Sequence, residues 1–122
     1  MFARIFSALF GSAAPADIQV TPALLATLAA MRREDKLQAL PAEARERLVP
    51  QIDSLLDRLA AGLEANPSRA WVLAQTLPTV AAFHLDDDTV KAACVARLRR
   101  IFSQLDMPGA GGAYLEKFGV DF

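Results

Sequence analysis

Apolar residues recur at helical spacing through most of the chain, and this pattern predicts an all-α fold. The clearest apolar stripe follows residues 41–65 and consists of Leu48, Ile52, Leu55, Leu56, Leu59 and Leu63. Similar faces are predicted for a helix that starts at Pro22, for one that starts at Pro67 and for one over residues 88–105. Because the connections are short, we expect these four main helices to pack as an antiparallel bundle.

Prolines next to capping residues predict where two of the helices begin. Thr21 is a typical N-cap residue and Pro22 suits the first helical position. Asn66 and Pro67 form the same kind of pair before the third helix.

Two further prolines lie inside predicted helices. Pro50 and Pro78 each remove a backbone donor, and Pro50 is expected to kink its helix or to split it in two. The stretch from residue 70 to residue 83 contains no charged residue, which predicts that this helix is the central, buried one.

Both ends of the chain are rich in large apolar residues. Residues 1–16 are expected to form a short N-terminal helix followed by a linker, with Phe2, Ile5, Phe6, Leu9 and Phe10 on one face. This face docks on the domain itself, contacts a partner or lies on a membrane surface, although its single Arg4 is few cations for a membrane helix. Residues 17–122 are expected to be one helical domain with a C-terminal tail packed back onto it.

Composition supports these expectations and excludes several functions. Ala and Leu supply 41 of the 122 residues, whereas Val and Ile supply 11, which argues against a β fold. A net charge of −1 argues against nucleic acid as a partner. One cysteine and one histidine give no basis for a disulfide framework, a metal site or a cofactor. The N-terminal apolar stretch is shorter than the core of a signal peptide, so a cytoplasmic location is expected.

An acidic stripe is the sharpest polar pattern. Glu46, Asp53, Asp57 and Glu64 are separated by 7, 4 and 7 residues, which places them on one face of the second helix, opposite its apolar stripe. A solvated face is the simpler interpretation. No cation accompanies the stripe at helical spacing, however, so a docking face for a basic partner is the functional interpretation.

The chain offers no catalytic motif. Cys94 falls on an apolar face and His84 on a different element, so they do not suggest a nucleophile and its base. The three adjacent carboxylates at residues 86–88 suit a helix start better than a metal site. We therefore expect that the protein is not an enzyme.

Several segments form a recognisable order along the chain: the helix after Thr21, residues 33–36, residues 55–59, residues 66–68, Leu73, residues 83–86 and the terminal residues 118–121. Together they resemble a small all-helical bacterial family of unknown activity. The resemblance covers about residues 20–122, and it departs from the family in a shortened acidic run and in a tail without Trp. It implies a helical fold and assigns no functional residues.

These observations predict a non-enzymatic protein-binding module. One concrete version is an immunity or antitoxin-type protein that occludes the basic cleft of a toxin, with Glu46, Asp53, Asp57 and Glu64 as its contacts. The alternative is a homo-oligomeric or membrane-peripheral structural module that uses Phe2, Phe6 and Phe10.

Overall fold

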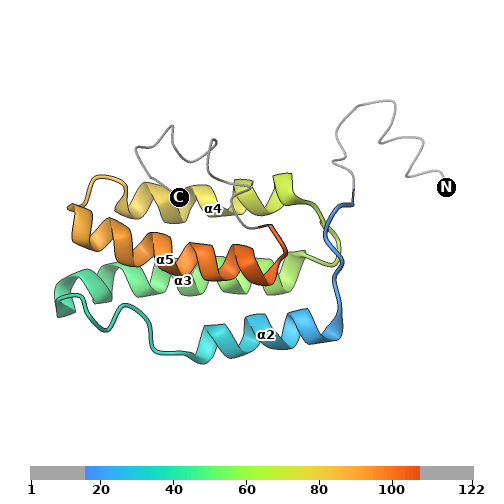
Figure 1. Cartoon of the computed structure of the whole chain (residues 1–122), viewed down its shortest axis with the longest axis horizontal. Helices are drawn as coiled ribbons and strands as arrows, with labels where there is room; N and C mark the ends of the chain where they lie inside the picture. The colour runs from blue at the N-terminus through green and yellow to red at the C-terminus, as the bar shows by residue number, and fades with distance from the viewer. Residues whose placement is uncertain (1–15, 108–122) are drawn as a thin grey trace.

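The computed structural model describes residues 16–107, and all of its regular structure is helical (Figure 1). Helix α2 spans Pro22–Arg33, α3 spans Ala42–Gly62, α4 spans Arg69–Phe83 and α5 spans Asp88–Gln104. The all-α class is confirmed. The predicted N-terminal helix with Phe2, Phe6 and Phe10, and the predicted packed tail, lie outside the described residues.

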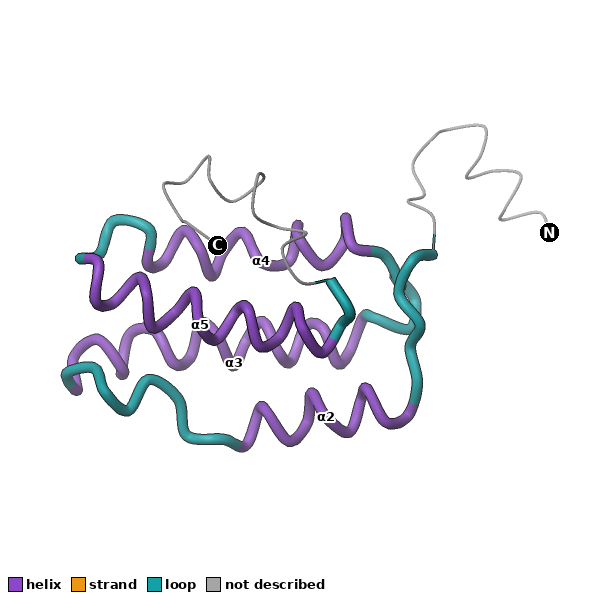
Figure 2. The backbone as a smooth tube through the Cα atoms, viewed as in Figure 1, coloured by secondary structure: helices purple, strands orange, loops and turns teal. Residues whose placement is uncertain are grey.

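The four helices lie along the long axis of the molecule, and the chain runs in opposite directions along consecutive helices (Figure 2). Helix α3 packs against both α2 and α4, and α5 contacts the same two helices. The apolar stripe predicted for α3 is buried as expected, from Leu48 to Leu63. Phe83 of α4 and Phe102 of α5 are the largest fully buried side chains.

Side-chain N-caps set three of the helix starts, with Thr21 before α2, Ser68 before α4 and Asp87 before α5. The Thr21 hydroxyl accepts the Leu24 N–H at 3.1 Å, as the sequence predicts. The start of α4 was predicted two residues too early, because Ser68 is the N-cap. Asn66 instead lies after the end of α3, and its side-chain amide donates to the carbonyl of Gly62, the last residue of that helix, at 2.9 Å. The Pro67 carbonyl accepts the N–H groups of Asp17 and Ile18, a tertiary contact that local signals do not reveal.

The two internal prolines do not divide their helices. Helix α3 continues through Pro50 and α4 continues through Pro78. Both prolines are exposed, so water can hydrate the carbonyl that each leaves without an intrahelical donor.

The uncharged helix is not the central one, contrary to the prediction. Helix α4 leaves Ala70, Ala74, Pro78 and Ala81 exposed, whereas α3 lies between α2 and α4. Exposing alanine costs little because its apolar surface is small, so absence of charge does not by itself require burial on all sides. None of the described helices is long and apolar enough to cross a bilayer.

Candidate functional site

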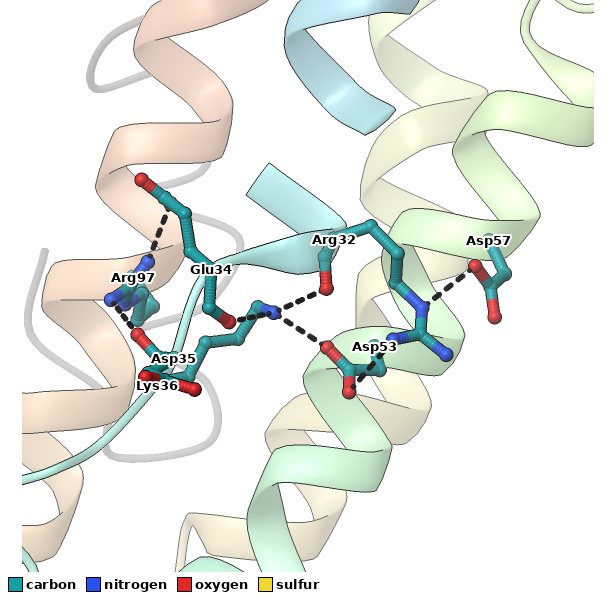
Figure 3. Close-up of polar contacts among 7 residues, drawn as sticks. All are labelled: Arg32, Glu34, Asp35, Lys36, Asp53, Asp57 and Arg97. Carbon is teal, nitrogen blue, oxygen red and sulfur yellow. Dashed lines mark hydrogen bonds and ion pairs between the residues drawn. The ribbon is translucent and has the colours of Figure 1, made fainter. Parts of the chain in front are cut away.

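A buried lysine organises the loop that follows α2. The Lys36 side chain is 1% exposed, and its Nζ donates to the carbonyls of Arg32 at 3.0 Å and Glu34 at 2.9 Å (Figure 3). The same Nζ lies 2.7 Å from Oδ1 of Asp53 on α3. Three oxygens therefore surround the ammonium group, which compensates for its removal from water. Lys36 thus caps the end of α2 and joins it to α3.

Arg32 connects the last turn of α2 to two of the predicted acidic residues. Its Nε donates to Oδ1 of Asp57 at 2.9 Å, and its Nη1 lies 3.2 Å from Oδ2 of Asp53 (Figure 3). The Asp53 side chain is 18% exposed and that of Asp57 is 60% exposed. Two of the four stripe carboxylates are consequently neutralised within the chain.

Glu34 connects the same loop to α5. Its carboxylate accepts hydrogen bonds from Arg97 at 3.0 Å and Arg100 at 3.1 Å, and Arg97 also donates to the Asp35 carbonyl. The hydrogen bond from Arg100 lowers the pKa of Glu34 most; burial opposes this shift and Arg97 reinforces it. The loop therefore ties α2 to α3 through Lys36 and to α5 through Glu34.

An open cleft of about 800 Å³ lies beside these ion pairs. Arg33, Arg45, Glu46 and Val49 are among its lining residues. Four basic and four acidic side chains line it in total, so the cleft does not select a ligand by net charge.

Glu46 lies exposed on α3, whereas Glu64 lies exposed in the turn after it, because α3 ends at Gly62 and not near residue 65 as predicted. Within residues 16–107 neither forms an ion pair. The structure therefore brings Asp53 and Asp57 together at the α2 contact, and it leaves Glu46 near the start of α3 and Glu64 beyond its last residue. Helical spacing does not predict Arg32 and Lys36 as partners of the stripe, because Arg32 lies on α2 and Lys36 in the loop that follows it.

Cys94 and His84 both lie in positions where they contribute to the fold. Cys94 is buried, and burial is the main cause that raises the pKa of its thiol to about 11, with a smaller contribution from Asp86. His84 caps the C-terminal end of α4, where its Nδ1 lies 3.2 Å from the Ala81 carbonyl oxygen.

The three adjacent aspartates serve different contacts. Asp87 is the N-cap of α5 and accepts the Val90 N–H at 3.0 Å. Asp86 binds Arg47 of α3 at 2.7 Å, and Arg47 also donates to the Ala82 carbonyl near the end of α4. Among the described residues there is no group of three or more His, Cys, Asp or Glu side chains suited to a metal ion.

Comparison with known proteins found no matching family model, no matching curated protein and no matching solved structure. The resemblance to a bacterial helical family stays a prediction.

Proposed function

We propose that this protein is a non-enzymatic protein-binding module that docks a basic partner surface against the outer side of α3. The single observation that carries this proposal is the exposure of Glu46 and Asp57 on α3 and of Glu64 in the turn after it, with Glu46 and Glu64 unpaired within residues 16–107. Unpaired carboxylates steer a cationic partner without first breaking an internal ion pair. An immunity or antitoxin-type role, in the cytoplasm, is the version we favour.

The internal ion pairs refine what such a partner must offer. Arg32 and Lys36 already neutralise Asp53, so Glu46 and Glu64 are the stripe carboxylates that a partner meets without a competing ion pair within residues 16–107. Glu46 and Gly62, the last residue of α3, are 16 positions apart, which corresponds to about 24 Å along a helix at 1.5 Å per residue, and Glu64 follows two residues later. A broad basic face fits this spacing, whereas a single short basic loop does not. In this proposal the four helices act as one antiparallel bundle that holds α3 rigid.

Co-expression with the product of the neighbouring gene tests the proposal. We expect the two proteins to form a complex and this chain to restore growth of cells that the neighbouring gene product inhibits. We expect the double variant Glu46→Gln with Glu64→Gln to bind that product about tenfold more weakly, since rim charges each contribute up to about 1 kcal/mol. The matched control is Ala92→Lys with Ala96→Lys, which changes the net charge equally at exposed positions of α5. The proposal is wrong if no complex forms and growth is not rescued, or if the control weakens binding as much.

A second candidate is a self-associating or membrane-peripheral module that uses the apolar face at Phe2, Phe6 and Phe10. The helical spacing of these residues favours it. Deletion of residues 1–12 separates the two functions. If deletion abolishes self-association or membrane pelleting and leaves the complex with the partner intact, the N-terminal segment has this separate role.

A further inference from the structure

Helix α4 presents an uncharged outer face, composed of Ala70, Ala74, Pro78 and Ala81. At 100° per residue these positions fall within about 80° of the helix circumference. Half-buried Leu77 lies beside them, and Leu85, which is 88% exposed, follows in the turn after the helix. A helix face in contact with water normally carries charged residues, and this face carries none.

Arg69, the first residue of α4, contacts both ends of the described chain. Its N–H donates to Oδ1 of Asp17 at 2.7 Å, and its Nη2 donates to the Asp106 carbonyl at 3.3 Å. Met107 follows Asp106 and is 1% exposed, so the last described residue is fixed in the core. The described chain therefore ends within reach of the Arg69 side chain, at the first turn of α4.

The C-terminal segment of the sequence is rich in large apolar residues. It carries five large apolar residues within nine positions: Tyr114, Leu115, Phe118, Val120 and Phe122. Six residues, 108–113, precede Tyr114 and can span up to about 20 Å when extended. The 15 residues of α4 extend over about 22 Å, so residues 114–122 can reach any part of its outer face.

We propose that residues 114–122 of the chain's own C-terminal segment dock on the outer face of α4. Small side chains at Ala70, Ala74 and Ala81 allow aromatic rings to lie close to the helix, where both surfaces lose apolar contact with water. A tethered segment also competes at an effective concentration on the order of millimolar, above that of a second copy at ordinary protein concentrations. The occupant is therefore the tail of the same molecule. This surface is separate from the α3 face of the proposed function.

A double-mutant cycle on the full chain tests the docking. Ala74→Glu places a charge on the outer face of α4, and Ala96→Glu is the matched control at an exposed position of α5. Each is combined with the native tail and with a tail carrying Tyr114→Ser, Phe118→Ser and Phe122→Ser. With the native tail, we expect Ala74→Glu to lower Tm by several degrees more than Ala96→Glu does. With the serine tail, we expect the two substitutions to lower Tm equally.

Hydrogen exchange provides a second measurement, and Phe118→Ser alone is the milder variant if the triple variant does not fold. We expect either tail variant to accelerate exchange at the amides of residues 74–82, by about tenfold for the triple variant. An Ala74→Glu effect that is identical with both tails overturns the proposal. So does a wild-type dimer that Ala74→Glu dissociates, because the occupant is then a second copy. Loss of the Ala74→Glu effect on deletion of residues 1–12, but not with the serine tail, assigns the face to the N-terminal segment and also overturns it.

Discussion

Replacing Lys36 with methionine removes the ammonium group that joins α2 to α3 while keeping a side chain of similar length. The change deletes two hydrogen bonds to backbone carbonyls and the 2.7 Å ion pair with Asp53. Breaking a buried ion pair costs about 3–5 kcal/mol. Here the cost is smaller, because Arg32 remains 3.2 Å from Asp53 as a partner for its carboxylate and because methionine has no charge to desolvate. We therefore expect the free energy of unfolding to fall by about 2–4 kcal/mol. A domain of this size is stable by about 5–15 kcal/mol, so the loss is large.

Urea unfolding followed by the fluorescence of Trp71, the only tryptophan, measures this loss. The control is Arg33→Met, which removes an exposed cation that has no ion pair within the described residues and should cost less than about 0.5 kcal/mol. A cycle with Asp53→Asn should give a coupling energy of about 1–3 kcal/mol. If Lys36→Met costs no more than Arg33→Met, the ammonium group does not hold the two helices together and our account of the loop is wrong.

Three further predictions follow from individual residues. Gly62→Ala should destabilise the protein by about 1–3 kcal/mol, because the new Cβ would lie 2.7 Å from Cζ2 of Trp71; chemical denaturation should show the cost disappearing in a Trp71→Leu background. The pKa of Glu34 is lowered below its ordinary value of 4.5, so its contribution to stability is present above that value and is lost as the pH falls through the lowered pKa. The Tm difference between wild type and Glu34→Gln should therefore shrink from about pH 6 to about pH 3, and a constant difference would contradict this assignment. Cys94 should react slowly with a thiol reagent at about pH 8 in the native state and readily after unfolding; fast native reaction would show that the thiol is accessible.

The helices and most of the core could be predicted from the sequence because their signals are local. Thr21 with Pro22 predicts the start of α2, and the apolar spacing from Leu48 to Leu63 predicts the buried side of α3. The end of α5 is less obvious, since Asp106 takes the left-handed conformation at φ 55° that glycine usually provides. The Asp106 N–H donates to Ser103 and the Met107 N–H to Phe102, which closes the helix without glycine.

The ion pairs of the candidate site could not be predicted from helical spacing. Arg32 and Asp57 are 25 positions apart, and their contact depends on how α2 packs against α3. For the same reason the sequence does not predict how much of α4 is covered. The lack of charged residues in α4 describes its composition, whereas its burial depends on which helices pack against it. The four stripe carboxylates are predicted from the sequence as one set, and the structure separates Asp53, which pairs with Lys36, from Glu46 and Glu64, which lie exposed.

The salt dependence of partner binding tests the central claim, that the exposed carboxylates on α3 and in the turn after it form a docking face. Association of the wild-type chain with the neighbouring gene product should slow as ionic strength rises, because salt screens exposed charges beyond about 10 Å at 0.1 M. The double variant Glu46→Gln with Glu64→Gln should show a clearly shallower dependence, whereas Ala92→Lys with Ala96→Lys should stay close to wild type. Equal salt dependence in the wild type and the glutamine variant would contradict the claim.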